Sequence, residues 1–192
     1  MRRGQRKRAG AGGSLRIIAG EYRGRRIPVS DRPELRPTGD RVRETLFNWL
    51  APVMPGSRCL DLFAGTGALA LEAASRGAKR VLAVERDRGL AAAIGELARE
   101  WGAGCVESVH ADALSLLSGP PEPFDVIFLD PPFEGRLLAP ALERLGSGWL
   151  APGALVYVET PAGGETAVPE GWSLERERRA GQVALRLYRA GD

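Results

Sequence analysis

The segment Asp61-Leu62-Phe63-Ala64-Gly65-Thr66-Gly67-Ala68 decides the predicted fold, because it joins a strand-like run to a helix-like run. Arg58–Phe63 has the length and apolar character of a buried strand, and Ala68–Arg76 is helix-like and closed by Gly77. Glycines at such a turn let the backbone approach a ligand that a Cβ atom would exclude. The segment therefore predicts a ligand site at the carboxyl end of a strand in an α/β protein.

The same alternation of strands and helices continues along the chain. Further strands are expected at Arg80–Glu85, Cys105–His110, Phe124–Asp130 and Ala154–Glu159, and further helices at Gly89–Glu100, Ala113–Leu117 and Leu137–Leu145. Alternating elements predict a Rossmann-like, doubly wound α/β fold with a mostly parallel sheet. Trp172–Arg179 and Gln182–Arg189 predict a closing hairpin that brings the sheet to seven strands, with an antiparallel strand at one edge.

The first 50 residues have a different character. Residues 1–13 are rich in Gly and Arg without periodicity and predict a disordered basic arm. Leu15–Ala19 and Arg26–Val29 flank a Gly-containing turn and predict a β-hairpin. A helix is expected from the N-cap residue Thr38 to Leu50. We expect residues 14–50 to form an N-terminal extension of a domain that spans residues 51–192.

The expected helix has an apolar face. It is formed by Val42, Leu46, Trp49 and Leu50, which recur at helical spacing. Arg41 and Arg43 are expected to lie away from that face.

Charge is distributed unevenly along the chain. Residues 1–43 hold 13 of the 27 basic and 4 of the 24 acidic residues, a net +9, and the remaining 14 basic and 20 acidic residues give −6. A strongly positive end on a mildly acidic body attracts a polyanion and favours a nucleic-acid partner. A solubilising tail, or a general preference for Arg, which makes up 25 of the 27 basic residues, is the alternative.

Several classes of protein are excluded by composition. No run approaches the roughly 18 apolar residues of a membrane span, and no apolar run follows the basic N-terminus as in a secretory signal. Cys59 and Cys105 lie far apart without a CxxC motif, and His110 is the one histidine, so no metal site is expected. Two unpaired thiols suit a reducing cytoplasm.

A carboxylate follows the glycine turn at an informative spacing. Glu85 ends the second strand, twenty residues after Gly65, where it can accept both hydroxyls of a ribose. The glycines alone also fit a dinucleotide site. Asp61 argues against a dinucleotide, because a pyrophosphate would bring negative charge close to its carboxylate. S-adenosyl-L-methionine, with a ribose, a sulfonium and an ammonium, suits these residues better; Asp61 as a buried acid that caps the loop amides is the alternative.

The second motif, Asp130-Pro131-Pro132-Phe133, ends the fourth strand. An exocyclic amine of a nucleobase is a poor nucleophile, and the carboxylate of Asp130 with the carbonyl of Pro131 can accept its two N–H groups. Two successive prolines fix φ and so set the carbonyl direction in advance. Phe133 offers a face on which a base can stack, and an ordinary strand terminus is the alternative.

Asp112, after the third strand, can accept a hydrogen bond from an adenine amine, with the Ala113 amide near a ring nitrogen. An N-cap for the following helix is an equal alternative, and one residue can serve both roles.

Taken together, these motifs resemble those of class I S-adenosylmethionine-dependent methyltransferases that act on an amino group. The flanking segments Arg16-Ile17-Ile18-Ala19-Gly20, Leu35-Arg36-Pro37-Thr38, Asp40–Leu50 and Ala180-Gly181-Gln182-Val183-Ala184 resemble the RsmD family of bacterial small-subunit ribosomal RNA guanine-N2 methyltransferases. The resemblance covers about residues 15–189, and the basic arm of residues 1–13 looks longer than the family requires.

The resemblance implies methylation of the N2 amine of one guanine of 16S rRNA, guanine 966 in the family, within an assembled or nearly assembled small ribosomal subunit. We expect a cytoplasmic monomer in which residues 14–50 bind RNA and residues 51–192 bind the cofactor and catalyse. The implied cofactor contacts are Asp61, Phe63, Ala64, Gly65, Thr66, Gly67, Glu85, Arg86, Asp112, Ala113 and Asp130, and the catalytic residues are Asp130, Pro131, Pro132 and Phe133. The expected RNA contacts are Arg16, Arg23, Arg25, Arg26, Arg36, Thr38, Arg41 and Arg43.

Three alternative functions share parts of this pattern. A DNA amino-methyltransferase acting on adenine N6 or cytosine N4 would use the same pocket, but the chain has no separate target-recognition domain. A noncatalytic RNA-binding assembly factor would not need Asp130 and Glu85. A dinucleotide oxidoreductase would bind nicotinamide and transfer no methyl group.

Overall fold

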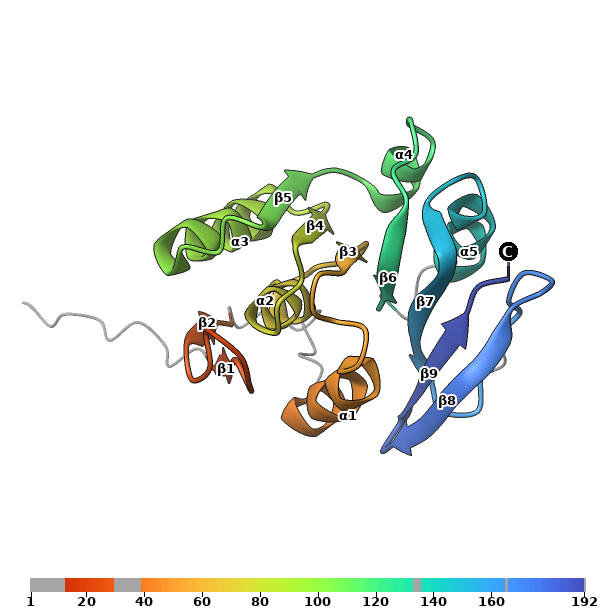
Figure 1. The fold of residues 1–192 in the computed structure, drawn as a ribbon, viewed down its shortest axis with the longest axis horizontal. Helices are drawn as coiled ribbons and strands as arrows, with labels where there is room; N and C mark the ends of the chain where they lie inside the picture. Colours follow the sequence, from red (N-terminus) through yellow and green to blue (C-terminus); the bar gives the residue numbers. More distant parts are fainter. Residues whose placement is uncertain (1–12, 30–38, 133–135, 165, 192) are drawn as a thin grey trace, which may run out of the picture.

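A computed structural model describes residues 13–29, 39–132, 136–164 and 166–191. The described residues form nine strands and five helices (Figure 1). In chain order they are β1 (Ser14–Arg16), β2 (Arg26–Pro28), α1 (Asp40–Leu50), β3 (Arg58–Asp61), α2 (Ala68–Ser75), β4 (Arg80–Glu85), α3 (Arg88–Trp101), β5 (Val106–His110), α4 (Ala113–Leu117), β6 (Phe124–Leu129), α5 (Leu138–Leu145), β7 (Leu150–Pro161), β8 (Ser173–Ala180) and β9 (Val183–Arg189).

Seven of the strands form one sheet in the order β5-β4-β3-β6-β7-β9-β8. The five strands from β5 to β7 are parallel, and β9 runs antiparallel between β7 and β8. The predicted Rossmann-like, mostly parallel seven-stranded sheet is therefore confirmed. The antiparallel strand β9 lies one position inside the edge, because the closing hairpin places β8 outermost.

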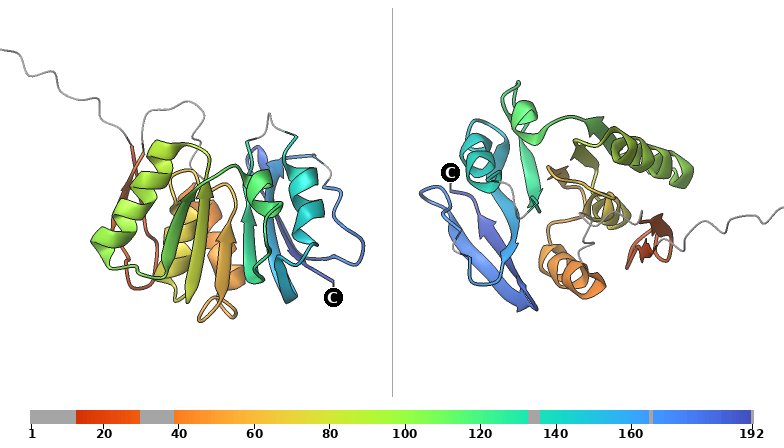
Figure 2. Two further views of the ribbon diagram at one scale, coloured as in Figure 1. Left: turned by 90° about the horizontal axis from the view of Figure 1, so that it is seen from above. Right: turned by 180° about the vertical axis from the view of Figure 1, so that it is seen from behind.

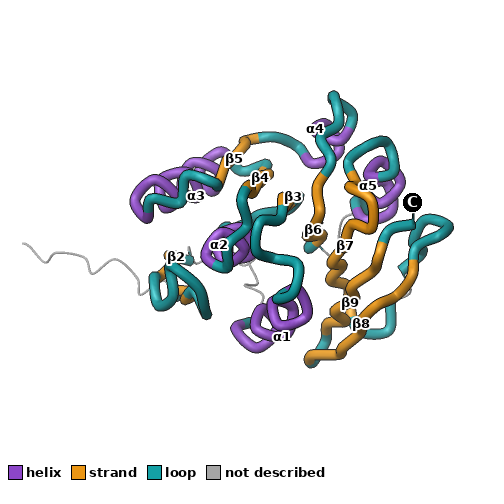
Figure 3. The backbone as a smooth tube through the Cα atoms, viewed as in Figure 1, coloured by secondary structure: helices purple, strands orange, loops and turns teal. Residues whose placement is uncertain are grey.

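Helices cover both faces of this sheet (Figures 2 and 3). Side chains of a strand point alternately to its two faces, so each strand contributes to two hydrophobic clusters. Cys59, Phe128 and Tyr157 pack with residues of the hairpin and of α1, α2 and α3, whereas Leu60 and Val158 pack with α4 and α5. Among the described residues, no helix has both the length and the apolar character needed to cross a membrane.

The predicted N-terminal hairpin is confirmed, with β1 antiparallel to β2, and hydrogen bonds from its backbone N–H groups fix it to α2. The fully buried Glu72 accepts hydrogen bonds from the backbone N–H of Ile18 (2.8 Å) and Ala19 (3.1 Å). Gly20 has a φ of +84°, and a Cβ atom there would lie 1.8 Å from the carbonyl oxygen of Ser75. Only glycine therefore allows the turn of the hairpin to approach α2 this closely.

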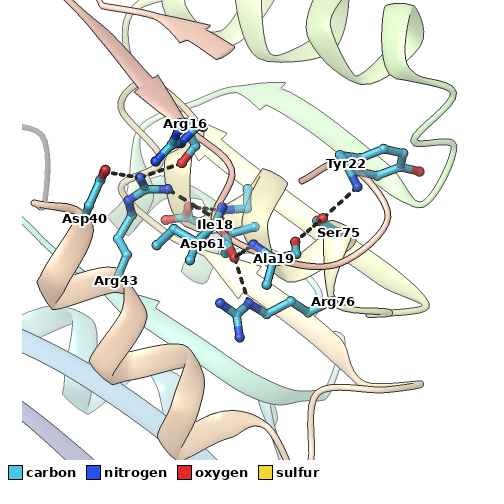
Figure 4. A network of polar contacts seen from close by, with 11 residues as sticks. Arg16, Ile18, Ala19, Tyr22, Asp40, Arg43, Asp61, Ser75 and Arg76 are labelled. Carbon is cyan, nitrogen blue, oxygen red and sulfur yellow. Dashed lines mark hydrogen bonds and ion pairs between the residues drawn. The ribbon is translucent and has the colours of Figure 1, made fainter. Parts of the chain in front are cut away.

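Arg43 corrects one prediction, since it lies on the buried face of α1 and not away from it. Its side chain is 0% exposed, and its position is one turn before Phe47 and two turns before Leu50 on the same face. Its Nη2 donates to the carbonyl oxygen of Arg16 (2.8 Å) and to Oδ1 of Asp40 (2.7 Å), as Figure 4 shows. Arg43 has no exposed surface for a phosphate and is therefore removed from the predicted RNA contacts.

The start of α1 also differs slightly from the prediction. The helix begins at Asp40 with Gly39 in the N-cap position, and Thr38 lies outside the described residues. The acidic side chain of Asp40 in the first turn suits the positive helix terminus.

Glu72 connects three elements, so its removal should be costly. Its carboxylate lies 3.7 Å from Nη1 of the buried Arg43 and 2.7 Å from Nε of Arg76. We predict that Glu72→Gln lowers the free energy of unfolding by about 2–4 kcal/mol, because the buried Arg43 loses its buried countercharge and keeps only the exposed Asp40. Chemical denaturation measures this change, and faster hydrogen exchange at the amides of Ile18 and Ala19 should accompany it.

The matched control for Glu72→Gln is Glu100→Gln, which alters an exposed carboxylate near the end of α3. Equal stability of the two variants would show that Glu72 does not hold the hairpin to α2.

Candidate active site at the carboxyl edge of the sheet

The register of the parallel strands brings their carboxyl ends to one edge of the sheet. Asp61 of β3 pairs with Ala83 of β4 and with Phe128 of β6. Glu85 of β4 pairs with His110 of β5. The residues that follow these strands therefore meet at one edge, as expected for the ligand site of a doubly wound sheet.

The glycine turn after β3 holds α2 close to α3. Gly67, the N-cap residue of α2, has a φ of +81°, and a Cβ atom there would lie 2.8 Å from Cγ1 of Ile94. Gly65 also has a positive φ, of +53°. The sequence predicted these glycines to permit close approach of a ligand; at Gly67 the close approach in this structure is that of a helix.

Glu85 links the first two strand–helix turns. Its Oε2 accepts from the backbone N–H of Gly65 (2.8 Å), and its Oε1 accepts from that of Asp87 (2.7 Å). Asp87 in turn caps α3 by accepting from the N–H of Leu90 (2.9 Å). The spacing of twenty residues in the sequence thus corresponds to a direct contact, which fixes the Glu85 carboxylate beside the glycine turn.

Asp61 is a buried acid at the end of β3, with 1% of its surface exposed. Its Oδ2 accepts a hydrogen bond from the backbone N–H of Ala70 (3.1 Å), so the capping role considered as an alternative is present. Burial and then the negative charge of Asp130 raise the pKa of Asp61 to about 7, although the bond from Ala70 opposes the shift.

Asp130 directly follows β6 and is half-buried, with Pro131 buried and Pro132 exposed beside it. Phe133, the last residue of the predicted motif, lies outside the described residues. Because Asp130 contributes to the raised pKa of Asp61, the two motifs that the sequence analysis identified lie close enough to interact electrostatically.

A further acid at this edge was missed by the sequence analysis. Glu159 of β7 is 6% exposed, and its Oε2 accepts a hydrogen bond from the hydroxyl of the fully buried Tyr157 (3.0 Å). Burial and the charge of Asp130 raise the pKa of Glu159 to about 7. Its position at the end of an apolar strand is the same signal that identified Glu85, so the sequence contained the information.

Each of four neighbouring strands therefore brings one carboxylate to this edge. They are Glu85 of β4, Asp61 of β3, Asp130 directly after β6, and Glu159 of β7. Such a row attracts an extended ligand that carries positive charge or several hydrogen-bond donors. In the part of the chain that the structure describes, no three His, Cys, Asp or Glu side chains are grouped so that they could hold a metal ion.

The remaining predicted cofactor contacts lie near the same edge. Oδ1 of the exposed Asp112 accepts from the N–H of Ser115 (2.9 Å), which makes Asp112 the N-cap of α4 as the alternative proposed. Nε2 of His110 lies 3.1 Å from the carbonyl oxygen of Arg86. Phe63 and Thr66 are half-buried in the glycine turn, and Ala64 and Ala113 are buried.

Most of the arginines predicted to contact RNA are exposed on the hairpin and on α1. Arg16, Arg23, Arg26 and Arg41 are exposed. Arg25 is also exposed, and its guanidinium lies 5.6 Å from the ring centres of both Tyr22 and Trp101. Arg36, like Thr38, lies outside the described residues.

The strand order, with the site at the carboxyl edge of the sheet, defines the class of protein. The chain has the fold of the class I methyltransferases. Residues 15–189 match the family model described as conserved hypothetical protein 95. The chain belongs to this family, which is the RsmD family, and the resemblance predicted from the sequence is confirmed.

Relatives with assigned names and solved structures agree with this membership. The chain is 49% identical to ribosomal RNA small subunit methyltransferase D of Escherichia coli (strain K12), covering 92% of this chain and 90% of that protein. The protein of the same name from Haemophilus influenzae is 45% identical, with 93% and 95% covered. The solved structure of yhhF from Escherichia coli superposes with a TM-score of 0.87 at 46% identity and covers 93% of this chain and 99% of that chain.

The raised pKa of Asp61 predicts how stability depends on pH. The folded protein binds a proton at Asp61 that the unfolded chain releases between about pH 4 and pH 7, so the free energy of unfolding should fall as the pH rises through this range. The side chain in Asp61→Asn does not titrate. Its free energy of unfolding should therefore fall less over this range than that of the wild type, by an amount on the order of 2–4 kcal/mol. Urea denaturation between pH 4 and pH 8 measures it.

Glu143→Gln, at an exposed carboxylate of α5, is the control and should leave the pH dependence unchanged. If the stability of the wild type rises from pH 5 to pH 8, or if both variants behave alike, the ionised Asp61 is not destabilised by its surroundings.

Proposed function

We propose that this protein uses S-adenosyl-L-methionine to methylate the N2 amine of one guanine of 16S rRNA, guanine 966, in an assembled or nearly assembled small ribosomal subunit. The observation that carries the proposal is the row of four carboxylates at the carboxyl edge of the sheet, with the glycine turn at one end and Asp130-Pro131-Pro132 near the other. The names of the relatives, which are small-subunit ribosomal RNA methyltransferases, support the choice of substrate.

The chemistry of the donor set fits S-adenosylmethionine. Each oxygen of Glu85 accepts one backbone N–H and has a second lone pair for a ribose hydroxyl. Burial and the charge of Asp130 raise the pKa of Asp61 to about 7, so a cationic ligand at this edge would offset unfavourable negative charge. When bound, this cofactor provides an electrophilic methyl group on a positively charged sulfur. The other proposed contacts are Phe63, Ala64, Gly65, Thr66, Gly67, Arg86, Asp112, Ala113 and Asp130.

Asp130 and its neighbours orient the guanine amine. The carboxylate of Asp130 and the carbonyl of Pro131 accept the two N–H groups and point the nitrogen lone pair toward the methyl group. Pro132 helps to fix the backbone, and Phe133 stacks on the base once it has been turned out of the RNA helix. Positioning of the two reactants supplies most of the rate enhancement. No strong base is required, because the amine proton becomes strongly acidic when the nitrogen is alkylated and then passes to Asp130 or to water.

We predict that Asp130→Ala reduces kcat for methyl transfer by about 10²–10⁴-fold while the Kd of S-adenosylmethionine changes much less. The reason is that Asp130 acts on the amine and only borders the cofactor. Transfer of a labelled methyl group to small ribosomal subunits gives kcat, and calorimetry gives the Kd.

Glu143→Gln again serves as the control and should behave like the wild type. A rate close to that of the wild type in Asp130→Ala would refute the assigned role. Failure of the wild type to bind S-adenosylmethionine would favour a noncatalytic assembly factor.

RNA binding is assigned to the basic hairpin and α1. Arg16, Arg23, Arg25, Arg26 and Arg41 present cationic side chains on elements that pack on the catalytic sheet. These contacts, with Arg36, Thr38 and the arm of residues 1–13, would position the RNA through its phosphates without reading its sequence. The substrate places the protein in the cytoplasm, where we expect it to act as a monomer.

Phosphate contacts make RNA affinity depend on salt. We predict that the double variant Arg23→Ala/Arg26→Ala weakens binding to 16S rRNA and makes the slope of log K against log salt shallower by about 1–2, because fewer counterions are released. Filter binding at several potassium chloride concentrations measures the slope.

The matched control is Arg88→Ala/Arg99→Ala, which removes two exposed arginines from α3. A slope that changes equally in both double variants would show that the hairpin makes no specific phosphate contact.

A further inference from the structure

Glu159 and Tyr157 form a buried polar pair that the proposed mechanism does not use. The hydroxyl of Tyr157 donates to Oε2 of Glu159 at 3.0 Å, and the two side chains are 0% and 6% exposed. Burying a carboxylate near a second carboxylate costs free energy that an apolar pair would not. An unfavourable arrangement of this kind at the ligand edge of a sheet indicates a functional role.

The pair lies beside Asp130, which orients the amine. Phe128 of β6 pairs with Tyr157 of β7, and Leu129 pairs with Val158, so Asp130 and Glu159 follow at the same level on adjacent strands. Phe128 and Tyr157 share one hydrophobic cluster, and the two acids lie two residues further along the same strands. Adjacent strands are about 4.8 Å apart, which places the carboxylates side by side at the site.

Two carboxylates side by side match the hydrogen-bonding edge of guanine. Guanine presents two adjacent donors on this edge, the N2 amine and the N1–H group. Adenine and cytosine each present an amine next to a ring nitrogen that is an acceptor. A second carboxylate next to the one that holds the amine therefore attracts guanine and repels the other two bases, because the lone pairs of the carboxylate and of the ring nitrogen would face each other.

We propose that Glu159 is a specificity-determining residue that accepts the N1–H of the target guanine while Asp130 holds its N2 amine. Tyr157 is a positioning residue, since its hydroxyl fixes one carboxylate oxygen of Glu159 and leaves the other for the base. The inference rests on the proposed methylation of guanine N2 and names the contact that selects guanine.

The test compares two substrates that differ at N1. Small subunits are reconstituted with a synthetic rRNA segment that carries either guanine or 2-aminopurine at the target position. 2-Aminopurine keeps the amine but has an acceptor at N1 and no N1–H. With saturating S-adenosylmethionine, the wild type should prefer guanine by about 100-fold in kcat/KM, because a buried acceptor is left without its donor.

Glu159→Gln should reduce this preference to less than about tenfold, since the side-chain amide can donate to N1 of 2-aminopurine. The Kd of S-adenosylmethionine should change by less than about threefold, because the altered group faces the base. Glu143→Gln should keep the preference of the wild type. A merely structural role for Glu159 would lower the rates on both substrates and leave their ratio unchanged, and that result would overturn the inference.

Two further outcomes separate this inference from the proposed function. Equal rates of the wild type on guanine and 2-aminopurine would overturn the inference and leave guanine methylation intact. Failure of the wild type to methylate guanine N2 at all would overturn both. If Glu159→Gln does not fold, Tyr157→Phe decides: it should lower kcat/KM on guanine about 5–20-fold with little effect on 2-aminopurine, and unchanged kinetics on guanine would contradict the positioning role.

Discussion

The burial of carboxylates close to one another at one edge of the sheet is the constraint on which the site depends. Asp61 and Glu159 are buried near Asp130, and each has a pKa raised to about 7. A fold selected for stability alone would place apolar residues at these strand ends. The arrangement is explained if a ligand with a positive centre and several donors occupies this edge, because it would compensate the negative charge. The glycine turn, the Asp130 motif and the Glu159–Tyr157 pair all border this one region.

A second buried acid, Glu72, connects the site to the basic end of the chain. It receives two backbone N–H groups of the hairpin and faces Arg43 of α1, while α2, to which it belongs, begins at the glycine turn. The exposed arginines of the hairpin are thereby held at a fixed distance from the carboxyl edge of the sheet. Under the proposed function, this one short helix couples the placement of the RNA backbone to the placement of the base.

The sequence predicted the fold well where local patterns decide it. Alternating apolar strands and helices fixed the order of the elements, and α4 and β4 have the predicted bounds. β7 is longer than the expected Ala154–Glu159, because pairing with β9 extends it to Pro161 and Leu150 pairs with Phe124 before a register shift. Such pairing involves residues far apart in the chain and leaves no local pattern.

The candidate site was predictable in part. Strand-end positions predicted that Asp61 and Glu85 lie at this edge, and in the structure Glu85 accepts from Gly65 of the glycine turn and Asp61 from Ala70 of α2. Their contacts with a cofactor stay a prediction. Arg43 was misjudged because the sequence pattern treats arginine as a surface residue. Asp40 lies three positions earlier in the same helix, but the buried countercharge Glu72 becomes apparent only in three dimensions. Glu159 ends an expected apolar strand, as Glu85 does, but the level that it shares with Asp130, 29 positions earlier in the chain, becomes visible only when β6 and β7 pair.

The most direct measurement is transfer of a labelled methyl group from S-adenosylmethionine to small ribosomal subunits that lack the modification, followed by mass spectrometry of the nucleosides. The account predicts one methyl group per subunit, recovered as N2-methylguanosine from 16S rRNA. Recovery of the label in another nucleoside, in DNA or in no product would contradict it.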